Sequence, residues 1–201
     1  MFILGLTGSI GSGKSEAAKA FRALGCPVFD GDAEAHRLLA DDPSAIFDVA
    51  ALVPSAVSDG VVDRRALADH VFASPELLMS LESVLHPKIL ASAMGFLDQQ
   101  RAQGAALVVL EMPLLFETGI QSACSAVAVV TVSADVQDQR VMACPGMTAA
   151  RLATIRARQL DPAEKAERAD YILDSMTGKE DMVAQVNALV TALTTHPEQT
   201  D

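Results

Sequence analysis

The segment from Gly8 to Ser15 constrains this chain more than any other. It reads Gly-Ser-Ile-Gly-Ser-Gly-Lys-Ser and matches the pattern GxxxxGK[ST] at every fixed position. A short apolar run, 2–6, precedes it, and a helical stretch from Ser15 to about Leu24 follows. This order of strand, loop and helix is the context in which the pattern cradles phosphate groups. The alternative, an ordinary glycine-rich turn, does not require the complete match seen here.

The spacing of this motif explains how it would hold a nucleoside triphosphate. Glycines allow backbone angles that turn successive N–H groups inward, and the helix N-terminus adds partial positive charge. The side chain of Lys14 then reaches the β- and γ-phosphates, and the Ser15 hydroxyl is placed to ligate Mg²⁺. We therefore predict that ATP contacts the whole loop, namely Gly8, Ser9, Ile10, Gly11, Ser12, Gly13, Lys14 and Ser15.

Apolar runs of strand length alternate with helical patterns along the chain, which predicts parallel strands joined by helices. Five such runs are expected to form one sheet, namely 2–6, 27–29, 107–110, 126–132 and 171–173. The long segment 33–105 reads as helical throughout. Because a simple crossover needs only one helix, this segment is expected to be an inserted helical subdomain.

Helix boundaries follow from capping residues and prolines. Asp63 is expected to cap a helix over 64–72, Ser74 and Pro75 to open a helix ending at Leu85, and Pro87 to start another that reaches about Gln103. Further helices are expected as a pair over 133–159, broken at Pro145-Gly146, and over 179–193, with a frayed tail at 196–201.

Composition excludes several classes of protein. A formal charge of −11 over 201 residues argues against nucleic-acid binding through phosphate contacts. The three cysteines are far apart and suggest free thiols in a reducing compartment. No apolar run has the length of a membrane span, and the N-terminus does not resemble a secretory signal. We expect a soluble, cytoplasmic protein.

Small kinases fit the remaining features best. A GTPase would need an Asn-Lys-x-Asp element, but the only asparagine is Asn187, which alanine follows. Asp30 and Asp32 come at the end of the second expected strand, where parallel sheets usually bind ligands. A carboxylate there can accept the proton of an attacking hydroxyl or hold Mg²⁺ through water. For Asp32 the alternative is an N-cap of a helix over 33–39, and the residues alone leave both roles open.

Several further blocks resemble dephospho-coenzyme A kinase. They are 5–15, 28–32, Asp63-Arg64-Arg65-Ala66-Leu67, Leu85-His86-Pro87, Pro113-Leu114-Leu115-Phe116-Glu117, and Ala169-Asp170 with Asp174. They follow the family's order from residue 1 to about 190.

The resemblance implies transfer of the ATP γ-phosphate to the ribose 3′-hydroxyl of dephospho-coenzyme A, the last step of coenzyme A biosynthesis. It also implies an α/β P-loop kinase fold, with a five-stranded parallel sheet flanked by helices, a helical substrate-domain insertion and a lid. The expected nucleotide-binding core is 1–32 with 105–201, the insertion 33–104, and the lid about 140–158.

The same resemblance assigns roles to individual residues. It makes Asp32 the catalytic base and assigns Asp30 to the turn or to the water shell of Mg²⁺. Arg64 becomes a contact for the anionic substrate, with a solvated helix face as the alternative. His86 matches the family's His-Pro, and we favour a structural role in a turn between helices over substrate contact. Glu111 is expected to act through Mg²⁺-bound water.

Glu117, by contrast, is expected to tether the loop that follows it.

The expected lid carries Arg140, Arg151, Arg156 and Arg158. Arg140 matches a family arginine and is our candidate for phosphate contact during transfer. For Arg156 a surface salt bridge is the better interpretation. The chain departs from the family at Cys144-Pro145, where Arg-Asp is typical, so Arg151 replaces the missing cation or turnover is slower.

Two alternatives stay open. One is another small-metabolite or nucleotide kinase of this fold, and the other, which the departure at Cys144 keeps open, is an ATP-binding regulatory protein without transfer activity. The implied ligands are ATP, Mg²⁺ and dephospho-coenzyme A, with a monomer or small homo-oligomer and no nucleic-acid or membrane partner.

Overall fold

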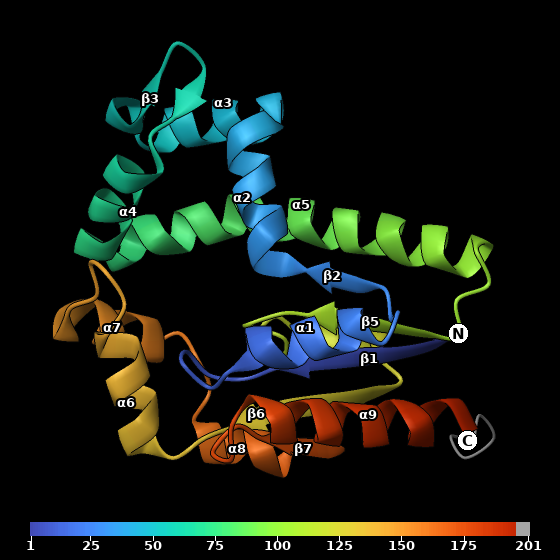
Figure 1. Ribbon diagram of the computed structural model, residues 1–201. Coiled ribbons are helices and arrows are strands. Elements are labelled where there is room, and N and C mark those ends of the chain that lie inside the picture. The colour runs from blue at the N-terminus through green and yellow to red at the C-terminus, as the bar shows by residue number, and fades with distance from the viewer. Residues whose placement is uncertain (196–201) are drawn as a thin grey trace. The chain divides into compact units, whose positions relative to one another are not determined.

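A parallel sheet of five strands organises the protein in the computed structural model, which describes residues 1–195 (Figure 1). The strand order is β2-β5-β1-β6-β7, and every pairing is parallel. The strands are β1 (Phe2–Thr7), β2 (Val28–Asp30), β5 (Leu107–Glu111), β6 (Ala126–Thr131) and β7 (Tyr171–Asp174). The five predicted strands are thus confirmed. The expected tail at 196–201 lies outside the described residues.

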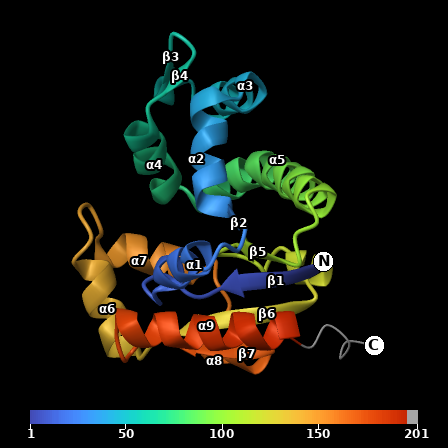
Figure 2. The same ribbon diagram turned by 45° about the vertical axis from the view of Figure 1, so that its right-hand side comes forward.

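Two helices lie side by side over one face of this sheet (Figures 1 and 2). They are α1 (Lys14–Ala23) and α9 (Lys179–Thr195). Phe21 of α1 and Val186 of α9 are fully buried against strand residues such as Leu4 and Leu6. This apolar layer fixes α1, and with it the loop that enters α1 from β1.

The chain divides into two compact units. One joins Met1–Asp30 to the described chain from Leu97 onward, and the other is Gly31–Phe96. The second unit has its own core, which includes Leu38, Val49 and Leu67. Its elements are α2 (Gly31–Asp41), α3 (Pro43–Leu52), the short helix η1 (Pro54–Ala56), β3 (Val57–Ser58), β4 (Val61–Val62), α4 (Arg64–Ala73) and most of α5 (Pro75–Ala102).

The second unit is not helical throughout, so that prediction was wrong. β3 and β4 form a small antiparallel hairpin in which Val57 faces Val62. Asp59 and Gly60 connect the strands with φ angles of 51° and 75°. Asp-Gly is the sequence that a two-residue turn with positive φ favours. The sequence therefore indicated the turn. The strands themselves could not be predicted, because two residues are too few to show the alternation of apolar and polar side chains.

The helix predicted to start at Pro87 does not exist as a separate element. α5 begins at Pro75, as expected, and continues through Pro87 to Ala102. An internal proline removes one backbone hydrogen bond and typically costs about 3 kcal/mol. Two pairs of buried side chains, each pair four residues apart, lie on either side of the proline: Leu81 and Leu85 before it, Ala93 and Leu97 after it. We infer that this continuous apolar stripe offsets the cost.

The remaining helices agree with the sequence analysis, with two additions. Asp63 caps α4 by accepting the N–H groups of Arg65 and Ala66, as predicted. The expected pair over 133–159 appears as α6 (Ala134–Met142) and α7 (Ala149–Arg156). The short helices η2 (Ile120–Ala123) and α8 (Pro162–Glu167) were not predicted. Within residues 1–195, no helix combines the length and apolar character that crossing a membrane requires.

Candidate active site

The loop between β1 and α1 needs its glycines. Gly11 and Gly13 have φ angles of 75° and 98°, which side chains of L-residues disfavour. A Cβ atom at Gly11 would lie 2.5 Å from Cγ2 of Val141, and one at Gly8 would lie 2.8 Å from the carbonyl oxygen of Val130. The loop is therefore packed closely against β6 and α6 and leads directly into the N-terminus of α1.

Lys14, the first residue of α1, is held by a buried carboxylate. Its Nζ lies 2.9 Å from Oε1 of Glu111, whose side chain is 2% exposed at the end of β5. Burial raises the pKa of Glu111, and the nearby ammonium group of Lys14 opposes that shift. A partly desolvated ammonium group at this position is available to a phosphate that competes with Glu111 for it.

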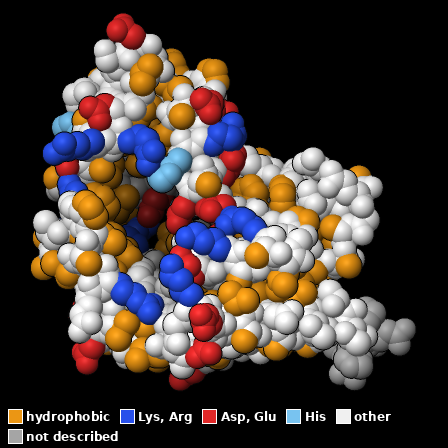
Figure 3. Space-filling model, in the orientation of Figure 1, with side chains coloured by type: hydrophobic (Ala, Val, Ile, Leu, Met, Phe, Trp, Pro, Cys, Tyr) orange, Lys and Arg blue, Asp and Glu red, His pale blue; other side chains and the backbone are white. Residues whose placement is uncertain are grey.

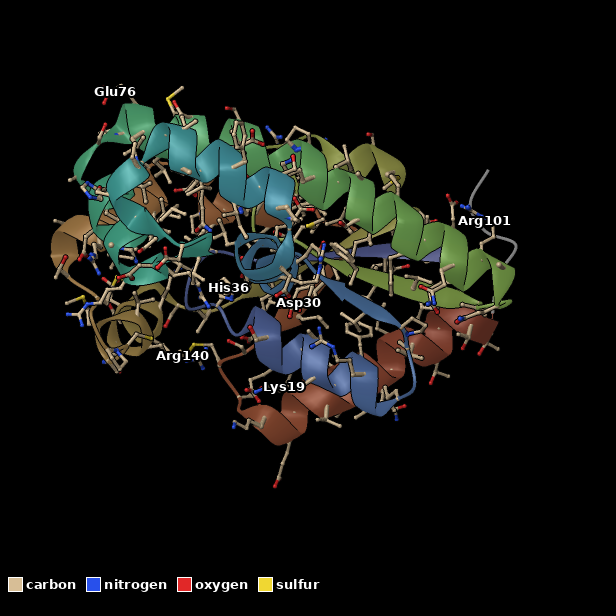
Figure 4. All side chains as sticks on the ribbon, turned by 90° about the horizontal axis from the view of Figure 1, so that it is seen from above. Lys19, Asp30, His36, Glu76, Arg101 and Arg140 are labelled. Carbon is tan, nitrogen blue, oxygen red and sulfur yellow. The ribbon has the colours of Figure 1, made fainter. Side chains whose placement is uncertain are left out.

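Asp30 and Glu111 occupy neighbouring strands in register, at the ends of β2 and β5. Figure 4 shows Asp30 at the end of β2. Arg22 of α1 lies 3.3 Å from Oδ2 of Asp30 and 3.6 Å from Oε2 of Glu111. The first unit thus brings Lys14, Asp30 and Glu111 together and adds Arg22, which no sequence motif indicated.

Charged side chains also lie together over the outer face of α1 (Figure 3). Glu16 pairs with Lys19 at 2.7 Å and with Lys179 of α9 at 3.6 Å. The hydrogen bond from Lys19 is the largest cause of the lowered pKa of Glu16. These exposed pairs contribute little stability, but they balance the charge around the loop.

The oxygen atoms of side chains at this edge of the sheet can supply some of the ligands of a magnesium ion. Oε2 of Glu111 is buried and has no hydrogen-bond partner among the described residues. The residues from 1 to 195 contain no cluster of three or more His, Cys, Asp or Glu side chains that would cage a metal alone. Mg²⁺ usually uses one or two carboxylates together with water and substrate phosphates. Two carboxylates and the Ser15 hydroxyl suit that mode.

Arg140 lies beside the phosphate loop, on α6 (Figure 4). Its guanidinium group donates to Oγ of Ser175 at 2.8 Å and to the carbonyl oxygen of Ser175 at 2.9 Å. A weaker contact of 3.5 Å reaches the carbonyl oxygen of Gly11. The Ser175 hydroxyl in turn donates to the carbonyl oxygen of Ser12. Ser175, which follows β7, thus links the predicted phosphate ligand Arg140 to the loop.

A hollow of about 210 Å³ lies next to these residues. It is lined by Gly13, Glu16, Arg140, Ser175, Gly178, Lys179 and Met182.

The other residues of the expected lid make local contacts. Arg156 pairs with Asp138, in agreement with the predicted surface salt bridge. Arg151 donates to the carbonyl oxygen of Gly146 at 3.1 Å. Cys144 is exposed, and its Sγ lies 3.5 Å from the carbonyl oxygen of Arg140. The replacement of the missing cation by Arg151 stays a prediction.

Asp32, Arg64 and His86 belong to the second unit. α2 begins at Gly31, so Asp32 lies inside its first turn and is not the N-cap of a helix over 33–39. Arg64 donates to Nε2 of His36 at 2.8 Å. His36 lies one turn after Asp32 on α2. The solvated-face interpretation of Arg64 is therefore incomplete, because the guanidinium group is held by a specific partner.

His86 lies within α5 and not in a turn between two helices, so that expectation was wrong. The continuous helix over Pro87 places the ring on a helix face, where it is half-buried. Burial lowers the pKa of His86, because it disfavours the charged imidazolium.

This burial predicts a pH-dependent stability. The folded state binds the His86 proton less readily than the unfolded state, whose pKa is about 6.5. The free energy of unfolding should therefore fall as the pH is lowered from about 8 to about 5, the range in which histidine titrates. Urea titrations over that range should give a shallower decline for His86→Gln than for the unaltered protein. Parallel curves would contradict this role for His86.

Comparisons with known proteins point to one family. The model of the dephospho-CoA kinase family matches residues 2–181. A dephospho-CoA kinase of Mesorhizobium japonicum is 45% identical over 193 residues, covering 96% of this chain and 97% of that protein. One of Rhizobium meliloti is 43% identical over 190 residues, covering 94% and 97%.

Solved structures support the fold. A crystal structure of a Thermus thermophilus protein matches with a TM-score of 0.78 at 37% identity, covering 95% of this chain and 96% of that one. Dephospho-CoA kinase from Campylobacter jejuni matches with a TM-score of 0.71 at 23% identity over 98% of both chains and supports the fold. From the family match and the identity of these relatives over nearly their whole length, we conclude that the chain belongs to the dephospho-CoA kinase family.

Proposed function

We propose that this member of the family carries out the family's reaction. Family membership makes it a transferase that phosphorylates the ribose 3′-hydroxyl of dephospho-coenzyme A with ATP and so completes coenzyme A. The observation that carries the assignment is the family match over 2–181, with an intact phosphate loop inside it.

The loop 8–15 binds the triphosphate. The N–H of Ile10 donates to Gln159, so the other backbone N–H groups of the loop and the N-terminus of α1 supply the sequence-independent attraction for phosphate. Lys14 leaves Oε1 of Glu111 and contacts the β- and γ-phosphates, which offer it more negative charge than one carboxylate does. The position of Lys14 supports this exchange, because its ammonium group already lies at the end of the loop beside Glu111.

A magnesium ion would be held by the Ser15 hydroxyl directly and by Asp30 and Glu111 through water. When bound, the ion neutralises charge on the transferring phosphoryl group and aligns its oxygens. Arg22 now balances the two carboxylates from α1. We expect its guanidinium group to move toward solvent when a divalent cation binds near Asp30 and Glu111, because one cation replaces the other.

Asp32 accepts the proton of the attacking 3′-hydroxyl. An alcohol is a weak nucleophile at neutral pH, so a positioned carboxylate assists attack. The loss of the capping alternative for Asp32 supports this role, since α2 begins before it. Arg64 contacts an anionic group of dephospho-coenzyme A, and its bond to His36 orients the guanidinium group for that contact.

Arg140 contacts the phosphates from the lid, about 140–158, and shares the charge that spreads over the transferring group. The adjoining hollow of about 210 Å³ supports nucleotide binding on this side of the loop. The core 1–32 with 105–201 binds the nucleotide, and the insertion 33–104 binds dephospho-coenzyme A. The division of the chain into two compact units supports this organisation. We further propose that His86 supports the insertion structurally, and that the protein acts in the cytoplasm as a monomer or small homo-oligomer.

A product assay tests the function. The protein is incubated with Mg²⁺-ATP and a panel of acceptors that includes dephospho-coenzyme A, shikimate and nucleoside monophosphates, and products are separated by chromatography. Coenzyme A should form with the first acceptor only. Turnover of another acceptor would favour a different small-metabolite kinase. ATP binding without any product would favour the regulatory alternative, which the departure at Cys144 keeps open.

A further inference from the structure

Ile10 of the phosphate loop is held on both sides by glutamine side chains. Its N–H donates to Oε1 of Gln159 at 3.0 Å, and its carbonyl oxygen accepts from Nε2 of Gln137 at 2.6 Å. Gln137 precedes the segment 140–158, and Gln159 follows it. Residues on both sides of the proposed lid therefore bind the backbone of the same residue of the phosphate loop.

The amide of Gln137 is itself fixed in one orientation. The side chain is 5% exposed, and its Oε1 accepts from Arg156 at 3.2 Å. Arg156 also pairs with Asp138, the next residue on α6. Because the oxygen faces the guanidinium group, the amide nitrogen must face Ile10. Arg156 thus has a second role that its interpretation as a surface salt bridge did not include.

Gln159 is fixed through its neighbour in the sequence. The N–H of Leu160 donates to Oε1 of Glu117 at 2.7 Å, and Glu117 pairs with Lys165 at 2.8 Å. Lys165 is fully buried and also donates to the carbonyl oxygen of Pro113 at 3.1 Å. Glu117 was expected to tether the loop that follows it, and this contact reaches further, to the end of the lid. A buried ion pair with these added bonds is a rigid anchor.

The two anchors are connected through the loop. Hydrogen bonds run from Gln137 of α6 to Ile10 and from Ile10 to Gln159. The next residue, Leu160, is joined through Glu117 to Lys165 of α8. Gln137 and Lys165 also line the same cavity of about 20 Å³, together with Ser9 and Ser12 of the loop.

We propose that Gln137 and Gln159 are positioning residues that hold the phosphate loop in its binding shape and fix both ends of the lid to it. This proposal rests on the proposed function, because the lid is part of that function. Movement of the lid is then confined to the segment between the two glutamines. Loss of either contact makes the phosphate loop more mobile, and ATP then binds less tightly. The lid also closes less accurately, so that water reaches the transferring phosphoryl group more often.

The opposite hydrogen-bonding roles of the two glutamines give a sharp test. In nucleotide-free protein, exchange of the Ile10 amide hydrogen with solvent is followed by ¹H–¹⁵N NMR. Gln159→Leu removes the acceptor and should speed exchange about tenfold, the effect of one hydrogen bond worth about 1–1.5 kcal/mol. Gln159→Glu keeps an acceptor oxygen and should retain protection. The added negative charge of this variant would repel ATP, so only its amide hydrogen exchange is measured and not its KM for ATP.

Kinetics test the second glutamine. Gln137→Glu still accepts from Arg156 but cannot donate to the carbonyl oxygen of Ile10. We expect it, like Gln137→Met and Gln159→Leu, to raise KM for ATP about tenfold and to raise the ratio of ATP hydrolysed to coenzyme A formed. Gln185→Leu is the matched control, because Gln185 binds both backbone groups of Asp174 in the same way. It should lower thermal stability and leave KM for ATP within about twofold.

Unchanged exchange at Ile10 in Gln159→Leu would overturn the proposal. So would an equal rise of KM for ATP in the Gln185 control, since that result would mean a general loss of stability. The exchange measurement uses no nucleotide and no acceptor. If the unaltered protein formed no coenzyme A, the proposed function would fail. The hydrogen bond between Ile10 and Gln159 could still be measured by exchange.

Discussion

Lys14→Ala is expected to lower turnover by about 10³-fold, because it removes the one charged side chain of the loop, which we propose contacts the transferred phosphate. Loss of a single preorganised donor in a site of this kind typically costs 10²–10³ in rate. The ammonium group of Lys14 is partly desolvated, with its side chain 11% exposed, so its attraction for phosphate is strong. Steady-state rates of coenzyme A formation at saturating dephospho-coenzyme A measure the effect, and KM for ATP should rise as well.

The buried partner of Lys14 requires a control. Without Lys14, Glu111 keeps a raised pKa and loses its nearest cation, so the single variant also destabilises the fold. The double variant Lys14→Ala, Glu111→Gln removes the stranded carboxylate and should recover thermal stability. Turnover should stay low. Recovery of turnover together with stability would mean that Lys14 acts on folding and not on the phosphates.

Most of the sheet could be predicted from the sequence because three of its strands, β1, β5 and β6, are largely buried on both faces. Such strands form continuous apolar runs, and 107–110 and 126–132 correspond to β5 and β6 within one residue at each end. The phosphate loop was predictable for a related reason, since eight consecutive residues contain all its requirements. Local sequence patterns were therefore enough to predict most of the sheet and the phosphate loop.

Features that depend on distant contacts could not be predicted in this way. The helix α5 continues through Pro87 because buried residues on both sides stabilise it, and propensity alone favours a break there. Ile10 and Gln159 are 149 residues apart in the chain. A glutamine has no motif that identifies the peptide group it binds, so only the structure finds Gln137, Gln159 and Arg22.

Asp32→Asn is expected to lower turnover by about 10²–10⁴-fold, the usual contribution of a general base. Asparagine keeps the size of the side chain but cannot accept the proton of the attacking hydroxyl at neutral pH. Because Asp32 is assigned to the acceptor and not to the triphosphate, ATP binding should remain within about twofold of the original value. Calorimetric titration with a non-hydrolysable ATP analogue and single-turnover rates measure the two quantities separately.

Asp30→Asn is the matched control for Asp32→Asn, since Asp30 lies two residues earlier and its carboxylate pairs with Arg22. This variant should weaken the response to Mg²⁺, because Asp30 is assigned to the water shell of the metal, and a higher Mg²⁺ concentration should restore most of its turnover. No concentration of Mg²⁺ should restore Asp32→Asn, because proton acceptance does not depend on metal occupancy. Rescue of both variants by Mg²⁺ would place both carboxylates around the metal and remove the base from the mechanism. Undiminished turnover of Asp32→Asn would show that departure of the hydroxyl proton needs no side chain, as a loose transition state permits.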